Sequence, residues 1–472
     1  MKQFFTVAFC FSSLLGFSQY KITLDAPQYK EGMSYLAYHM GKNLNVADSA
    51  EVNSKGIAVF SGTANLPGGI YSIVFPGKRF TSDFFIDKPQ QIKIELKDTL
   101  QLEKIKVEGS AENILFEEYQ KYVAEKGPIL GKARQNYISA KTQKDSLKYE
   151  KEFKDVNNEI INYRNNILKD HPESMMALML SAMKESPYPT KVPVTRQDSL
   201  DNYNFYKEHY WDGISFMDER VVRTPFFIPK LERYYREVIS QAPDSIIKDI
   251  DYKLLLARSA PELYKFMLNW LTDEYINPKY MGQDAVFVHL FNKYHSKGLS
   301  PWLNEKQMEV ITRRAYMQMS NLIGEPAANL SLIDSTGKVK SLYDLKAEYT
   351  IVVFWDPNCG HCKEELPRID SIYRASWKSK GLKIYAVLTE NHIPQWINYI
   401  KDNKLGDWTH VYQSDAMAEA EKKSSVASYR QLYDVTQTPT VFLLDKDKRI
   451  IGKKLTWEQI NDLLEVKIKN KK

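Results

Sequence analysis

Cysteine is scarce in this chain: the 472 residues contain three, Cys10, Cys359 and Cys362. So few cysteines exclude a scaffold held by several disulfides, and no second pair exists to complete a zinc site with Cys359 and Cys362. Dense lysine and arginine runs are also missing before the tail 467–472, and a formal net charge of +6 is mild for this length. We therefore expect no metal site and no nucleic-acid binding.

Long apolar runs are missing after the first residues, so we expect no transmembrane segment in the mature chain. Residues 1–18 combine one positive charge, an apolar core that includes Cys10, and the small residues Gly16 and Ser18 near the end. This arrangement is typical of a secretory signal peptide. The sequence therefore predicts export to the periplasm or cell envelope, with a single cysteine pair left in the mature chain.

That pair lies in a Cys-Gly-His-Cys motif between a predicted strand and a predicted helix. Residues 351–355 are all apolar, as in a strand buried on both faces, and Asp356-Pro357 is a turn signal. A helical pattern opens at Lys363, directly after the motif. A strand, a tight turn and a helix that begins at a Cys-x-x-Cys are the setting in which this motif indicates dithiol redox chemistry.

The position of the two thiols predicts different roles for them. At a helix N-terminus, Cys359 would face unpaired backbone N–H groups and the positive end of the helix dipole, which favour a thiolate. His361 would add a positive charge and a donor beside it. We predict that Cys359 is the nucleophile and that Cys362, one helical turn later, is the resolving thiol.

Three segments give the chain a resemblance to the thioredoxin superfamily, and more closely to its extracytoplasmic TlpA/ResA-like branch. They are Val352–Trp355, the Cys359-Gly-His-Cys362 motif, and Thr438-Pro439 with the apolar residues that follow. The resemblance implies an α/β thioredoxin fold over the last third of the chain. It also implies a cis-proline at Pro439 and a client strand docked on the backbone at Thr438, and we place Trp355 in the same substrate-binding surface.

The chain departs from the thioredoxin pattern at one acidic position. Thioredoxins carry a buried Asp six residues before the first cysteine, and this chain has Val353 there. In the ResA-like branch a Glu three residues after the second cysteine does related work, and Glu365 has that spacing. We therefore expect Glu365 to be the acid/base helper; the alternative is an ordinary first-turn glutamate favoured by the helix dipole.

Four segments are expected from the change of pattern along the chain. Alternating apolar and polar residues with turn signals predict a small all-β, sandwich-like domain that resembles a domain of unknown function fused to exported thioredoxins. Apolar residues at three- and four-residue steps then predict a mostly α-helical domain, whose many aromatics fit a core or a client-binding groove. The predicted bounds are 1–18 for the signal peptide, 19–109 for the β domain, 110–322 for the helical domain and 323–472 for the thioredoxin-like domain.

The function that these features favour is that of an exported thiol-disulfide oxidoreductase without a cofactor. Its partners would be client proteins with disulfides or thiols and a membrane thiol-electron carrier. His361 favours an oxidising couple and the ResA-like features favour a reductase, so we lean to the reductase or isomerase direction. Two alternatives stay open: an envelope client-binding protein whose cysteine pair is a redox switch, and a Cu(I) carrier that uses both thiolates.

Overall fold

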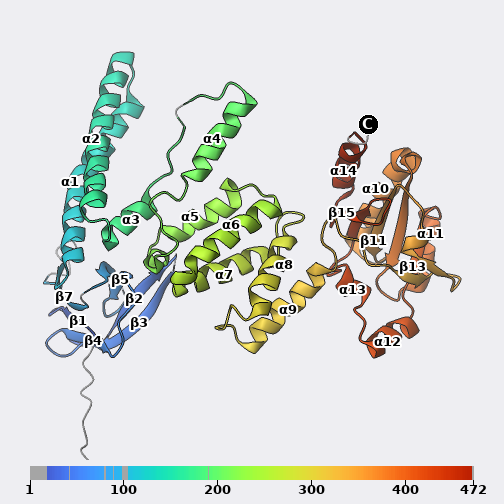
Figure 1. The fold of residues 1–472 in the computed structure, drawn as a ribbon, viewed down its shortest axis with the longest axis horizontal. Coiled ribbons are helices and arrows are strands. Elements are labelled where there is room, and N and C mark those ends of the chain that lie inside the picture. Colours follow the sequence, from blue (N-terminus) through green and yellow to red (C-terminus); the bar gives the residue numbers. More distant parts are fainter. Residues whose placement is uncertain are drawn as a thin grey trace, which may run out of the picture. The chain divides into compact units, whose positions relative to one another are not determined.

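The structure is a computed structural model that describes residues 19–469 except residues 42, 79–80, 89, 98–104 and 190. The predicted signal peptide and Cys10 lie outside the described residues. The chain divides into two compact units (Figure 1). The first comprises residues 1–239 and 252–266, and the second comprises residues 240–251 and 267–472.

The first unit begins with two four-stranded sheets that share one hydrophobic core. The sheets have the strand orders β4-β1-β7-β8 and β3-β2-β5-β6. Ile22 and Ile92 from one sheet and Leu36 and Phe84 from the other are at most 3% exposed within this core. The alternating pattern thus forms the predicted sandwich, although β1 pairs with β7 in parallel rather than antiparallel. The strands are β1 Tyr20–Asp25, β2 Met33–Met40, β3 Asn43–Glu51, β4 Ile57–Gly62, β5 Gly69–Val74, β6 Thr81–Ile86, β7 Gln91–Glu95 and β8 Lys106–Glu108.

Two long helices follow the sandwich and lie side by side (Figure 1). Ser110 and Thr142 cap their N-termini by accepting backbone N–H groups, and the rings of Tyr122 and Tyr163 stack between them at 4.0 Å. Both helices lie in the part of the chain for which the sequence predicted helices. The helices up to residue 276 are α1 Ala111–Ser139, α2 Gln143–Asp170, α3 Met175–Met183, α4 Arg196–Glu208, η2 Glu219–Arg223, α5 Phe227–Arg233, η3 Tyr234–Val238, α6 Pro243–Leu256, η4 Ala257–Ser259 and α7 Pro261–Ile276.

The second unit contains a seven-stranded sheet of thioredoxin type. Its strand order is β10-β9-β13-β12-β11-β14-β15, with β11, β12 and β13 parallel and β14 antiparallel to β11. The strands are β9 Ser331–Ile333, β10 Val339–Ser341, β11 Tyr349–Trp355, β12 Leu382–Leu388, β13 Thr409–Tyr412, β14 Thr440–Leu444 and β15 Ile450–Lys453. The helices of this part are η6 Leu342–Asp344, α10 Gly360–Ile372 with its continuation η7 Tyr373–Trp377, η8 Lys378–Lys380, α11 Ile393–Asp402, α12 Asp415–Ser424, α13 Tyr429–Leu432 and α14 Trp457–Lys469.

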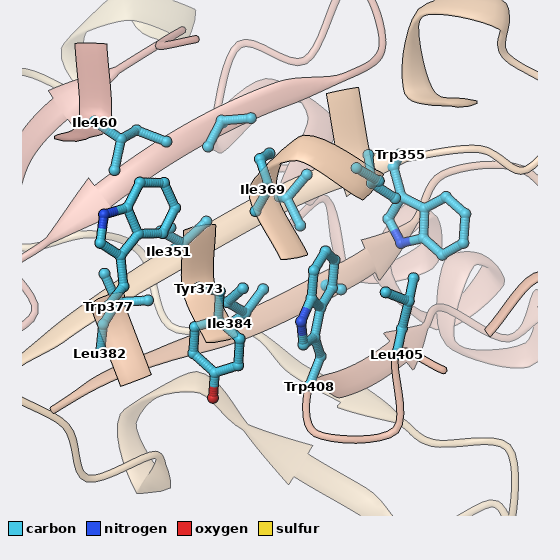
Figure 2. Close-up of a cluster of buried hydrophobic side chains, with 14 of the residues drawn as sticks. Ile351, Trp355, Ile369, Tyr373, Trp377, Leu382, Ile384, Leu405, Trp408 and Ile460 are labelled. Atoms are coloured by element: carbon cyan, nitrogen blue, oxygen red, sulfur yellow. The ribbon is translucent and has the colours of Figure 1, made fainter. Parts of the chain in front are cut away.

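Strand β11 is buried on both faces, as its unbroken apolar run predicted. On one face Ile351 and Trp355 join a cluster with Ile369 of α10 and Ile460 of α14, and on the other face Phe354 packs in a second cluster. Figure 2 shows the first cluster, with Trp355 at one end and Trp377 at the other. The strand that leads into the cysteine motif is therefore fixed from both sides.

Helices before residue 323 also belong to the second unit, and buried charges join them to the sheet. These helices are α8 Asp284–Lys293, η5 His295–Lys297 and α9 Glu305–Met319. The Lys453 ammonium at the end of β15 pairs with Asp284 and donates to the Asn321 side chain at 2.9 Å. Arg314 of α9 donates to Asp434 at 2.6 Å. The four predicted domain bounds stay a prediction.

Within the described residues, no helix is both long enough and apolar enough to cross a membrane.

Candidate active site

The cysteine pair lies where β11 ends and α10 begins. Asp356 opens the connecting turn, and its carbonyl accepts the Cys359 N–H at 3.2 Å. Cys359 is the N-cap of α10, and its sulfur accepts the Cys362 N–H at an N–S distance of 3.4 Å. The helix starts at Gly360, three residues earlier than its apolar pattern indicated, because the cysteine sulfur accepts the backbone N–H that a capping oxygen usually accepts.

The two thiols have opposite acidities. Partial burial opposes ionisation of Cys359, but hydrogen bonds from the Thr438 side chain, from the backbone and thiol of Cys362 and from the His361 backbone outweigh it and lower the pKa of Cys359. Cys362 is 1% exposed, and this burial raises its pKa to about 12. One thiol is thus half-exposed and ionises readily, and the other is buried and does not. This arrangement is the one required for a nucleophile and a resolving group.

The Thr438–Pro439 segment faces the nucleophile. The Thr438–Pro439 peptide bond is cis, as the resemblance to thioredoxins implied. The Cys359 thiol donates to the Thr438 carbonyl at 3.2 Å. Residues far apart in the sequence thus meet at the dithiol, and the backbone at Thr438 lies where a strand approaching Cys359 would pass.

Three other predicted site residues lie close to the motif in the sequence. His361 is exposed, and its backbone N–H donates a hydrogen bond that favours the Cys359 thiolate. Glu365 is half-buried and pairs with Arg368, one turn along α10, at 3.5 Å. Trp355 is 0% exposed and packs against the Tyr399 ring at 5.2 Å, so its side chain belongs to the core below the motif. The placement of Trp355 corrects the expectation that it contacts substrate.

Sequence reasoning missed the pair of Asp356 and His392. The Asp356 side chain is 8% exposed, and its two oxygens accept the Asn358 N–H at 2.7 Å and the His392 Nδ1 at 2.9 Å. The backbone N–H of Asp356 also favours the ionised form of Cys362. The sequence marks Asp356 only as part of a turn signal, and no motif surrounds His392.

The part of the chain that the structure describes was expected to hold no metal site, and its acidic, histidine and cysteine side chains bear on that expectation. No group of three or more His, Cys, Asp or Glu side chains converges there in a way that could hold a metal ion. The chemistry available to the described residues near the motif is that of the two thiols and the groups that touch them.

Comparison with known proteins places this geometry in a family context. Residues 323–453 match the family model of the AhpC/TSA family, and residues 20–116 match DUF4369, a domain of unknown function. The thiol-disulfide oxidoreductase ResA of Bacillus cereus is 29% identical over 143 residues, which are 30% of this chain and 75% of ResA.

Two solved structures illustrate the range of similarity. A domain of a possible thiol-disulfide isomerase from Cytophaga hutchinsonii is 34% identical and matches 32% of this chain and 95% of its own, with a TM-score of 0.28. A thioredoxin-like protein from Bacteroides caccae is 20% identical and matches 60% of this chain and 99% of its own, with a TM-score of 0.46.

The two family models and the similarity to ResA carry the conclusion about this chain. It has a thioredoxin-like domain of the AhpC/TSA family after a DUF4369 domain, and it is a thiol-disulfide oxidoreductase.

Proposed function

We propose that this protein is an exported oxidoreductase that exchanges disulfides with client proteins through Cys359 and Cys362, in the reductase or isomerase direction. The observation that carries the proposal is the difference between the two thiols: Cys359 is accessible with a lowered pKa, and Cys362 is buried with a raised pKa. Export rests on the sequence of residues 1–18, which has the features of a signal peptide.

The reaction follows from the order in which the two sulfurs become available. The Cys359 thiolate attacks one sulfur of a client disulfide, forms a mixed disulfide and releases the other client sulfur as a thiolate. Cys362 then loses its proton and attacks the Cys359 sulfur, which closes the Cys359–Cys362 disulfide and releases the second client thiol. Two electrons pass from the dithiol to the client, and an external thiol donor, which we propose to be a membrane thiol-electron carrier, must restore the reduced pair.

The site residues take the following roles in this proposal. The backbone at Thr438 and cis-Pro439 receives the client strand, since its carbonyl lies 3.2 Å from the Cys359 sulfur. His361 contributes its backbone N–H to the Cys359 thiolate. Glu365, which pairs with Arg368, is our proposal for an acid/base helper. We also propose residues 323–472 as the catalytic domain and residues 19–322 as the segments that select or hold clients.

The test is the reduction of insulin disulfides by the full chain with dithiothreitol as electron donor. We expect the chain to accelerate insulin precipitation. Cys362→Ala, reduced and then freed of dithiothreitol, should accumulate a mixed disulfide with insulin through Cys359. Cys359→Ala should trap nothing and serves as the matched control. Failure of the wild-type chain to accelerate the reaction, with no trapped complex in Cys362→Ala, would contradict the proposal.

A further inference from the structure

The site contains two histidines, and only one of them has a fixed partner near the dithiol. His361 lies within the motif but is exposed. His392 lies 36 positions from Asp356 in the sequence, yet its Nδ1 donates to the Asp356 carboxylate at 2.9 Å. The contact forms because β11 and β12 are parallel neighbours, so the segments after them meet at the same edge of the sheet.

Asp356 links this histidine to both cysteines. One carboxylate oxygen accepts the Asn358 N–H at 2.7 Å, and the Asp356 carbonyl accepts the Cys359 N–H at 3.2 Å, which closes the turn before the helix. The backbone of Asp356 also favours the ionised form of Cys362, although burial outweighs this effect and raises the pKa of Cys362. The carboxylate that anchors His392 is thus part of the turn that presents the nucleophile.

His392 is itself held at the end of its own segment. Its backbone N–H donates to the Glu390 carbonyl at 2.7 Å, and its carbonyl accepts the Trp396 N–H at 2.9 Å at the start of α11. Thr389, just before it, donates to the Trp355 carbonyl at 3.0 Å. Backbone hydrogen bonds therefore hold the imidazole beside Asp356, whereas its side chain remains 44% exposed and open to protons from solvent.

The other charged groups on neighbouring elements have partners of their own. Glu390 pairs with Arg430 of α13 at 2.7 Å, and Asp415 of α12 accepts a hydrogen bond from Asn391. The charge that the Asp356–His392 pair presents to the dithiol therefore depends on His392: the pair is neutral with the imidazole protonated and negative with it neutral. Across a β-turn of about 7 Å, one unit of charge changes the ionisation of a neighbouring thiol by about tenfold.

We propose that Asp356 and His392 form a positioning pair that fixes the turn carrying Cys359 and, through the charge of His392, sets the redox equilibrium of the dithiol. Protonated His392 compensates Asp356, favours the Cys359 thiolate and so stabilises the reduced pair. Neutral His392 leaves the carboxylate uncompensated and favours the disulfide. The inference rests on the proposed function of the same dithiol, and it assigns the tuning to His392 rather than to the motif histidine His361.

The experiment measures the redox equilibrium of the Cys359/Cys362 pair in the full chain against reduced and oxidised glutathione, from pH 5 to 8, where imidazoles change charge. For His392→Gln we expect a ratio of reduced to oxidised chain about tenfold lower than in wild type wherever the wild-type imidazole is protonated, which equals about 30 mV. Where the wild-type imidazole is neutral, the two ratios should be equal. His392→Lys keeps the positive charge, so its ratio should equal that of wild type with a protonated imidazole across the whole range.

Two further variants distinguish tuning from disruption of the fold. Asp356→Asn should raise the ratio of reduced to oxidised chain, opposite to His392→Gln, because it removes the negative charge; a damaged turn would move both variants in one direction. His209→Gln is the matched control, because His209 pairs with Asp212 at 2.7 Å outside the site, and it should change the ratio by less than about twofold. The inference is overturned by equal ratios in wild type and His392→Gln, by shifts of the same sign in the Asp356 and His392 variants, or by an equal shift in His209→Gln. A wild-type dithiol inert to glutathione would instead overturn the proposed function.

Discussion

Two of the histidine–aspartate pairs in the described residues, His39–Asp83 and His392–Asp356, have sharply different surroundings. In the β sandwich, His39 Nε2 lies 3.3 Å from Asp83 and 3.4 Å from the Ser72 hydroxyl, and Ser72 also donates to Asp83. The three residue types are those of a hydrolytic triad, but a triad uses both ring nitrogens, one for the acid and one for the serine. Here one nitrogen faces both partners, and Ser72 is 0% exposed.

The pair in the thioredoxin-like domain differs because a nucleophile lies beside it. The Asp356 carboxylate and His392 flank a turn that ends in a half-exposed sulfur at a helix N-terminus. The two regions together show that a set of polar residue types does not make a reactive site. A reactive site also needs an accessible nucleophile with groups that favour its ionised form. Of these two regions, only the second has such a nucleophile.

The largest expected effect is on the rate of thiol-disulfide exchange, when the nucleophile is replaced. We expect Cys359→Ser to reduce thiol-disulfide exchange with insulin by at least about 1,000-fold, because a hydroxyl does not supply a nucleophile that replaces a thiolate. Ser72→Ala, in the other polar cluster, should leave the exchange rate unchanged. A comparable loss in Ser72→Ala would mean that the sandwich contributes to the reaction.

A smaller effect concerns a histidine that has no carboxylate partner. His410 in β13 donates Nε2 to the Leu405 carbonyl at 2.8 Å, and burial lowers the pKa of His410 to about 4 from 6.5. Between these values the unfolded chain binds a proton that the folded chain does not, so the free energy of unfolding falls as the pH drops from about 6.5 to about 4. The loss should reach about 3 kcal/mol.

Urea denaturation at pH 7 and pH 4.5 measures this loss, with the thioredoxin-like domain followed by its tryptophan fluorescence. His410→Gln can still donate to the Leu405 carbonyl and does not titrate, so its stability should depend less on pH than that of wild type. Equal pH dependence in both proteins would contradict the assignment to His410.

The smallest effect belongs to the pair in the sandwich. Burial opposes ionisation of Asp83, but hydrogen bonds from His39 and Ser72 outweigh it and lower the pKa of Asp83. The stabilisation is therefore present above the ordinary pKa of an aspartate and is lost on acidification through the lowered pKa. Because the side chain is 44% exposed, solvent screens the interaction, and we expect Asp83→Asn to cost about 1 kcal/mol at pH 7.

The matched readouts for Asp83→Asn separate the two regions. The cost should shrink towards pH 3 in urea denaturation, and the glutathione equilibrium of the dithiol should not change. A redox shift in this variant comparable to that of Asp356→Asn would show that the two pairs are not independent.

The sequence predicted those parts of the fold whose pattern is local and regular. β11 was expected from the unbroken apolar run 351–355, and the cis bond before Pro439 followed from the resemblance to thioredoxins. Helix α12 was not predicted, because none of its residues is buried and no apolar stripe marks it. Residues 373–377 continue α10 as a π-helix, which an apolar period cannot indicate.

The site, too, could be predicted only where its pattern is local in the sequence. Both cysteines are close in the sequence, so their roles could be inferred from their position at a helix start. The Asp356–His392 contact needs two loops after neighbouring parallel strands, and neither loop carries a motif. Glu365 had the right spacing, but spacing alone does not fix the direction of a side chain, and here it pairs with Arg368.

The most direct test of the account is the alkylation rate of each cysteine in the reduced full chain, resolved by peptide mass spectrometry from pH 4 to 10. We expect Cys359 to react at least about 100-fold faster than Cys362 at pH 6 to 7, with an apparent pKa below the ordinary thiol value of about 8.5. Cys362 should react only when the chain is unfolded. Equal rates for the two thiols in the folded chain, or a faster Cys362, would contradict the assignment of Cys359 as the nucleophile.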